Sequence, residues 1–505
     1  MSAFHKPHVW FPPALLLLCA VGALLLARDD ATLPLSKDMQ YYWARHYWQA
    51  TLDAVSVSCG VGLATYGLST DYTARGQWTL ALLGVGGAAL FLVASVQAFH
   101  RVAAADGRRA MPAVWAALVA FAIVQFVGVL TVGVTQTALG VSFDIAAIAQ
   151  SGIATAASTG WLDNAADRRE QWSLAGVGLL AALGPAVWLL AWPRWRTLAG
   201  GVAPILRVAL GYAAFLLAAI LLMTALEAPR GGTSLARRDA TPETTGLARL
   251  ERSALQTLAA AGAGLQTSPL ADRAFSDGSK FLLAVVILVG GLPGGVTGGM
   301  KWPLFALVAT AGFRALLAHA RRANHGPAYI RAGDHASAPA ISDHARAQPD
   351  PSTPSDSPTP VDHATVAPPA HRATFAPAAH AAPSAARDSA AWMRAATAVV
   401  AAVMLLAVGG ALGLLLIESA TASAYQPAPS FADALLDAAS AVGGAGLTTG
   451  LFASVTSRNL SSGIRQATDQ YQYGMAWFML LMLLGRAAPV VVLGRAAASE
   501  RRAAA

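Results

Sequence analysis

The chain has 505 residues, of which 55% are hydrophobic and 12% are charged, and its formal net charge at pH 7 is +8. Because soluble domains carry roughly 25% charged residues, this composition excludes an ordinary soluble protein and predicts a polytopic protein embedded in a lipid bilayer. The two cysteines have no CxxC spacing, so the sequence indicates neither a disulfide framework nor a cysteine metal site. The basic residues cluster just beyond apolar runs, so the positive-inside rule explains the positive charge without a nucleic-acid partner.

Eight apolar runs, which we interpret as membrane spans, follow one another in four pairs. In chain order the pairs are 12–27 with 78–98, 112–132 with 172–192, 202–226 with 281–317, and 395–417 with 475–493. Basic residues follow the second run of each pair. Since cytoplasmic loops carry an excess of lysine and arginine, we expect both termini and the connections between pairs to lie on the cytoplasmic side.

Between the two runs of each pair lies a shorter apolar segment that ends in a patch of small residues. The segments are 48–59, 143–150, 246–261 and 431–443, and the patches are GVGL at 60–63, QSGI at 150–153, GAGL at 262–265 and GAGL at 444–447. This recurrence predicts an internal fourfold repeat of span, re-entrant half-helix, glycine turn and span. The fold expected is therefore an all-α membrane protein with eight transmembrane helices and four re-entrant pore helices.

The predicted repeats occupy residues 1–111, 112–201, 202–322 and 389–505. Residues 323–388 separate the third repeat from the fourth and are rich in alanine, proline and histidine, with almost no large apolar side chains. Such a segment cannot bury enough surface to offset the entropy of ordering, so we predict a disordered cytoplasmic insert. Its histidines are too widely spaced to predict a metal site.

The sequence GGLPGGVTGGMK at residues 290–301 interrupts the second run of the third repeat. Glycine and proline are the residues least able to continue a helix. Irregular backbone at this depth must be enclosed by protein or line a wet cavity, because lipid offers no hydrogen-bond partners. The interruption therefore predicts a transport pathway, the alternative being a cytoplasmic loop between two short spans.

Four glycine turns around one axis would present a ring of backbone carbonyls able to replace the hydration shell of a monovalent cation. The candidate residues of this selectivity filter are Gly60, Val61, Gly62, Ser151, Gly152, Ala263, Gly264, Ala445 and Gly446. The alternative is that the small residues only let transmembrane helices pack closely.

Four motifs carry a resemblance to a known family. They are SAVGGAGLTTG at 440–450, MLLGRAAP at 482–489, GGLPGGVTGGMK at 290–301 and RGQW at 75–78. With them the chain resembles the Trk/Ktr/HKT superfamily of potassium transporters over nearly its whole length apart from the insert and the first dozen residues, most weakly in the second repeat. The resemblance implies four M1–P–M2 units around one ion path, a homodimer in a bacterial inner membrane, and a cytosolic RCK-type regulatory subunit that binds a nucleotide.

The resemblance also implies that the broken helix of the third unit is a gating loop beneath the filter, facing an arginine of the last helix. The matching gate residues are Gly294, Gly295, Thr297, Gly298, Gly299, Lys301 and Arg486. For Arg486 the residues themselves support the same role, because an ionisable side chain inside an apolar run is expensive and defaults to a functional role. The alternative is an interfacial arginine that snorkels to the headgroups. For Lys301 two alternatives stay equal: its side chain faces water in an inner vestibule, or it snorkels to the cytoplasmic headgroups.

The function expected is potassium uptake through this filter, without covalent chemistry and without a cofactor in this chain. No GxxxxGK[ST] phosphate-binding loop is present, so we do not expect an enzyme that hydrolyses ATP. In the family that the chain resembles, glycine at all four central filter positions accompanies selectivity for potassium. The alternatives are a sodium-permeable or poorly selective relative, a non-conducting sensor or scaffold subunit, and, least favoured, a carrier for organic solutes.

Overall fold

The structure is a computed structural model of the chain. It describes residues 6–28, 31–32, 39–63, 72–103, 110–140, 145–157, 168–184, 202–228, 246–263, 270, 275–292, 295–324, 382–421, 429–452 and 467–504. Within these residues the regular structure is helical apart from one isolated antiparallel bridge between Thr32 and Tyr72. The predicted all-α class is confirmed for this part of the chain.

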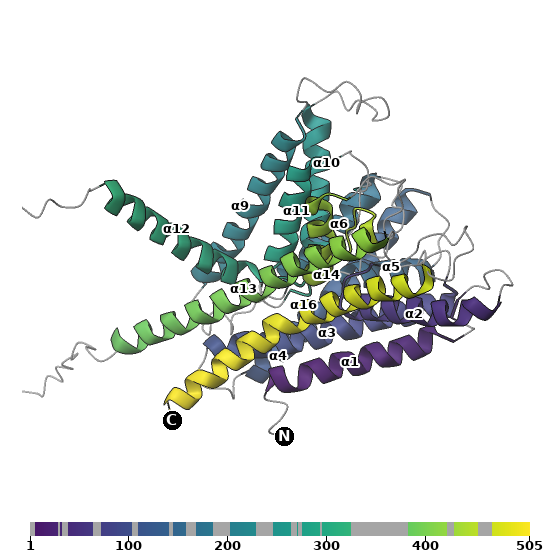
Figure 1. Ribbon diagram of the computed structural model, residues 1–505, viewed down its shortest axis with the longest axis horizontal. Helices are drawn as coiled ribbons and strands as arrows, with labels where there is room; N and C mark the ends of the chain where they lie inside the picture. Colours follow the sequence, from purple (N-terminus) through teal and green to yellow (C-terminus); the bar gives the residue numbers. More distant parts are fainter. Residues whose placement is uncertain are drawn as a thin grey trace, which may run out of the picture. The chain divides into compact units, whose positions relative to one another are not determined.

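The described helices lie mainly within the four stretches of the chain that were predicted as repeats, and the fourfold repeat itself stays a prediction. The first three are α1 (Pro7–Leu26), α2 (Met39–Ser58) and α3 (Ala74–Ala103), and the next three are α4 (Ala110–Ala138), α5 (Ile145–Ala156) and α6 (Arg168–Leu183). The third repeat holds α9 (Val202–Leu226), α10 (Gly246–Leu258) with the π-helix η2 (Ala259–Ala263), α11 (Asp277–Val289) and α12 (Trp302–Asn324), and the fourth holds α13 (Ala382–Thr421), α14 (Phe431–Gly443) and α16 (Ala467–Ala504). Helices from the two ends of the chain, α1, α3 and α16, run side by side (Figure 1).

Two compact units divide the chain, one formed by Met1–Thr310 with Ser389–Ala505 and the other by Ala311–Asp388. All residues of the candidate site belong to the first unit. In the second unit, the described residues are the later part of α12 and the first turns of α13. Most of the predicted insert lies outside the described residues, but α12 continues to Asn324 and α13 already begins at Ala382, so helix extends into both predicted ends of the insert.

Seven helices in the described part of the chain are long and apolar enough to cross a membrane. They are Pro7–Leu26, Ala74–Arg101, Met111–Ala138, Leu206–Leu226, Trp302–Ala320, Trp392–Ser419 and Gln472–Ser499. The expected span 172–192 is described only in its first part, as the 16-residue α6, which is shorter than the roughly 20 residues that a bilayer requires. These helices make the chain a multi-pass membrane protein.

Local sequence signals set the bounds of the two helices next to the glycine-rich break. Ser430 caps α14 because its hydroxyl oxygen accepts a hydrogen bond from the Asp433 N–H. The Asp433 carboxylate in turn accepts a hydrogen bond from the Ser430 N–H, and the two bonds together form a capping box. Ser276 caps α11 in a similar way through the Ser279 N–H. Each helix ends where a glycine takes a positive φ, at Gly290 with 65° and at Gly444 with 71°.

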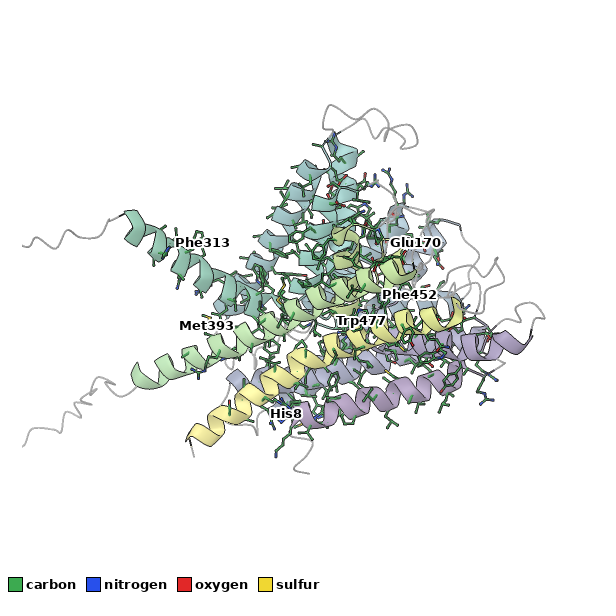
Figure 2. The ribbon with its side chains drawn as sticks, in the orientation of Figure 1. His8, Glu170, Phe313, Met393, Phe452 and Trp477 are labelled. Carbon is green, nitrogen blue, oxygen red and sulfur yellow. The ribbon has the colours of Figure 1, made fainter. Side chains whose placement is uncertain are left out.

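The short helix α14 lies inside the main core. All of its residues from Ala434 to Gly443 are buried, including the polar Asp437 and Ser440. It packs against α11 and α16. Of the two aromatic residues labelled near it in Figure 2, Phe452 packs against Phe478 of α16, and Trp477 of α16 donates a hydrogen bond to the Gly410 carbonyl of α13. A helix too short to span the bilayer that is buried on every side fits a re-entrant helix enclosed by spanning ones.

This packing depends on close approach of α16 to the end of α14. A Cβ at Gly485 would lie 2.6 Å from Val442 Cα, whereas one at Gly409 in α13 would meet no atom within 4 Å. Because overpacking costs about 1–3 kcal/mol, Gly485→Ala should lower the thermal unfolding temperature of the detergent-solubilised protein.

The matched control is Gly409→Ala, which should leave that temperature unchanged or raise it, since alanine is favoured over glycine inside a helix by about 0.5–1 kcal/mol. Fluorescence-detected size-exclusion after heating measures both variants. Equal effects would contradict the close packing of α16 on α14.

Candidate functional site

Two of the four predicted glycine turns have the same backbone geometry. After α2, Gly60 and Gly62 have φ of 62° and 75°, and after α14 the equivalent Gly444 and Gly446 have φ of 71° and 68°. The same hydrogen bond closes both helices, since Val61 N donates to Ser56 O over 2.8 Å and Ala445 N donates to Ser440 O over 3.1 Å. Alternating left-handed residues let successive carbonyls face one side, which L side chains would resist.

The turns of the first and fourth repeats also lie next to each other. The carbonyl oxygen of Gly60 is 3.1 Å from the position that a Cβ on Gly444 would occupy. Residues separated by most of the chain therefore come together at these two turns, and the shared ion path stays a prediction.

In the second repeat the prediction of a turn at 150–153 is wrong. The helix α5 runs through Ser151 and Gly152 and ends only at Ala156. A Cβ on Gly152 would collide with the backbone of α4 at Val129, so this glycine serves close helix packing, which was the alternative for the small-residue patches. The part of this repeat that reaches the turns is Ala157, whose carbonyl oxygen lies 3.5 Å from a Cβ placed on Gly60.

In the third repeat the predicted turn is described only at its beginning. Gly262 and Ala263 are still helical, as the last residues of η2, and a Cβ on Gly262 would collide with the backbone of Gly178 in α6. Gly264 lies outside the described residues, and its place in a turn stays a prediction.

The glycine-rich break at 290–301 is enclosed by protein, as its position in the membrane demands. Leu292 N donates to Ala182 O over 3.0 Å and Val296 N donates to Ala181 O over 3.2 Å, so the loop pairs carbonyls of the last turn of α6 that the helix itself leaves free. At the other end of the loop, Met300 N donates to Leu288 O in the last turn of α11 over 2.7 Å. Gly294 lies outside the described residues.

The loop also touches the end of the short buried helix α14. A Cβ on Gly298 would lie 2.8 Å from the carbonyl carbon of Gly443, where α14 ends and its glycine turn begins. The Thr297 hydroxyl accepts a hydrogen bond from Gly291 N over 3.1 Å, which closes the loop on itself. Gly299 has a φ of 77° and lies against the last carbonyls of α11. The break is thus a folded plug at the base of the turns.

Two buried cations hold this plug in place. Lys301 is 1% exposed and its Nζ donates to the carbonyl of Gly295 over 2.9 Å and to the carbonyl of Thr297. It has a φ of 69°, which is rare outside glycine and directs its side chain back over its own loop. Of the two alternatives for Lys301, snorkelling to the headgroups is therefore excluded in this conformation.

Arg486 joins the plug to the first glycine turn. It is 2% exposed; its Nε donates to the carbonyl of Cys59, and its Nη1 donates to the carbonyl of Val296 over 2.7 Å. Its Nη2 is buried without a hydrogen-bond partner and lies where a Cβ on Gly60 would be. A snorkelling arginine would reach the interface, so this alternative is excluded for Arg486 as well.

Both cations lie over the ring of Phe91 in α3. The ring centroid is 4.5 Å from Arg486 Cζ and 5.1 Å from Lys301 Nζ, within the range of cation–π attraction. Among the described residues, neither cation contacts a carboxylate. Sequence reasoning missed Phe91, because nothing in its local sequence distinguishes it from the other apolar residues of α3.

The arrangement has a direct electrostatic consequence. Two unit charges 4 Å apart interact by about 4 kcal/mol at an effective dielectric constant near 20. A cation that reached the base of the turns would therefore meet a substantial barrier while Arg486 and Lys301 stay in place. The site therefore combines backbone carbonyls, which attract a cation, with two fixed positive charges, which repel one.

Comparisons with known proteins support the fold. No protein-family model matches the sequence, and no curated protein matches it. The chain is similar to the crystal structure of the potassium transporter TrkH from Vibrio parahaemolyticus, with a TM-score of 0.56 and 15% sequence identity, over 97% of this chain and 84% of that one. At this identity the similarity shows a common fold.

The contact between Gly60 and Arg486 gives a test of the site. Gly60→Ala should lower the unfolding temperature more than Gly140→Ala. Both glycines have a positive φ, which costs an alanine about 1–2 kcal/mol, but a Cβ on Gly140 would meet nothing within 4 Å, whereas one on Gly60 would displace Arg486. Thermal unfolding in detergent measures the difference, and equal losses would place Arg486 away from this turn.

Proposed function

We propose that the protein lets potassium ions cross the membrane through the carbonyl oxygens of its glycine turns, with residues 290–301 and Arg486 as the gate. The observation that carries the proposal is the double contact of Arg486. One buried guanidinium binds the Cys59 carbonyl at the base of a turn and the Val296 carbonyl in the break. An ionisable side chain inside a span defaults to a functional role, and this one contacts the glycine-rich break.

The chemistry of the turns favours a bare monovalent cation over an organic solute. Around the turns of the first and fourth repeats the chain offers glycine, Val61 and Ala445, so the ligands available are backbone carbonyls. Carbonyl rings replace the hydration shell of potassium, whereas an organic substrate requires polar or charged side chains for recognition near the midplane. The fold shared with TrkH, described as a potassium transporter, supports the same ion.

The closed gate is held by charge-assisted hydrogen bonds. Opening requires Arg486 to leave the Val296 carbonyl and Lys301 to move with its loop, and bonds of this kind contribute about 1.5–3 kcal/mol each. We propose that a cytosolic RCK-type subunit with a bound nucleotide drives this movement, and that two copies of the chain form a homodimer in a bacterial inner membrane with both termini in the cytoplasm. These parts of the proposal are supported by the sequence resemblance and by the basic residues beyond the spans.

A sodium-permeable or poorly selective channel is the second candidate. It is favoured by the helical conformation of Ser151 and Gly152, since these two residues do not form the glycine turn that residues 60–62 and 444–446 form. A ring with unequal carbonyl contributions discriminates less well between two cations of the same charge.

The two candidates separate in a flux experiment. The purified chain in liposomes should conduct potassium, with and without a candidate RCK subunit, and the reversal potential in mixed sodium and potassium solutions should report a preference for potassium. Equal permeability to both ions would establish the second candidate. Absence of flux under every condition would contradict both and indicate a sensor or scaffold subunit.

The gate has its own test. Arg486→Ala should raise potassium flux without the regulator by roughly 10- to 100-fold, because one charge-assisted bond of about 1.5–3 kcal/mol and the fixed charge are both lost. The matched control is Arg495→Ala, which removes an exposed arginine from the same helix and should leave the flux unchanged. Wild-type dependence on the regulator in Arg486→Ala would remove Arg486 from the gate.

A further inference from the structure

Two buried aspartates occupy equivalent places in the first and fourth repeats. When the turns are aligned so that Gly62 matches Gly446, Asp53 of α2 matches Asp437 of α14, and both are 0% exposed. Neither belongs to the plug or to the turns. In the third repeat the equivalent residue is Leu255, which offers no hydrogen-bond acceptor.

Asp437 binds the chain directly after its turn. Its Oδ1 accepts hydrogen bonds from Thr449 N over 2.7 Å and from the Thr449 hydroxyl over 3.1 Å. Its Oδ2 accepts from the Thr448 hydroxyl over 2.8 Å and from Phe452 N over 2.9 Å. The ring of Phe452 in turn packs edge-on against Phe478 of α16, with centroids 4.9 Å apart. One carboxyl group therefore ties the segment that leaves Gly446 to the pore helix that enters the turn.

Asp53 makes the corresponding tie with a different partner. Its Oδ2 accepts a hydrogen bond from the Tyr72 hydroxyl over 2.8 Å, and Tyr72 belongs to the segment that leads from the first turn into α3. Tyr72 is itself fixed, because it pairs with Thr32 and its carbonyl accepts from Gln77 Nε2 over 3.1 Å. In both repeats a buried carboxyl group thus connects the pore helix to the chain beyond the turn.

Such ties are important because a glycine turn has little stiffness of its own. Glycine explores more backbone conformations than any other residue, so its carbonyls keep their places only if the surrounding chain holds them. We propose that Asp437, and Asp53 in its place in the first repeat, are positioning residues that set the preference for potassium by clamping the chain on the far side of each turn. This inference rests on the proposed function, because it concerns the selectivity of the same path.

The decisive variant is Asp437→Asn, which keeps the size of the side chain. Each carboxyl oxygen accepts from a backbone N–H, so whichever oxygen becomes an amide NH₂ faces a donor, either Thr449 N or Phe452 N, and that bond is lost. The ratio of potassium to sodium permeability, taken from reversal potentials in liposomes, should fall at least about tenfold while potassium still passes. A side chain that serves only folding would change the amount of conducting protein and leave this ratio alone.

The matched control is Asp433→Asn on the same helix. Asp433 caps α14 and pairs with Lys280 over 2.6 Å, but it does not touch the segment after the turn, so the ratio should stay within twofold of wild type. Thr449→Val gives a milder second variant, because it removes one hydroxyl and keeps the N–H bond. It should shift the ratio in the same direction by a smaller factor, and it decides the question if Asp437→Asn does not fold.

The outcomes are distinguishable. Wild-type selectivity in a conducting Asp437→Asn, or in Thr449→Val where the first variant does not fold, overturns the inference and leaves the proposed function intact. Absence of potassium flux in the wild-type protein overturns the proposed function and the inference with it.

Discussion

A chain that is interrupted inside a bilayer must find a partner for every exposed backbone group without help from water. At residues 290–301 those partners come from several elements at once. The backbone N–H groups of Leu292 and Val296 donate to carbonyls of α6, and the ammonium group of Lys301 donates to two carbonyls of its own loop. Arg486 donates to a third carbonyl of the loop, so the break is stable only when α6, α14 and α16 are all assembled around it.

The hydrogen bonds that satisfy the loop also have an electrostatic consequence. The donors that satisfy the loop are cationic side chains, and the described residues place no carboxylate against them. The groups that stabilise the interruption are therefore the groups that repel an arriving cation, and the aromatic face of Phe91 allows both to stay buried. If the path is the one we propose, the same hydrogen bonds satisfy the backbone and close the path, so a movement that opens it must supply new partners to the loop.

The sequence allowed the spans, the break and the turns around Gly62 and Gly446 to be predicted, because each depends on local composition. It did not distinguish these turns from Gly152, since small residues serve equally in a turn and between packed helices. A signal was present: Gly160 stands four residues beyond Ala156, the end of α5, just as Gly62 stands four residues beyond Ser58, the end of α2. Phe91, Val296 and Asp437 could not be found in this way, because their roles depend on residues brought together by folding.

The bond between Arg486 and Cys59 joins residues 427 positions apart. The helix that carries Arg486 is the last one of the chain, and it packs against the first three. During synthesis the first turn therefore enters the membrane long before the arginine that completes its base exists. A nascent chain that has not yet added α16 leaves the Cys59 and Val296 carbonyls without this cation, so the link between the first turn and the break forms only after α16 has joined the bundle.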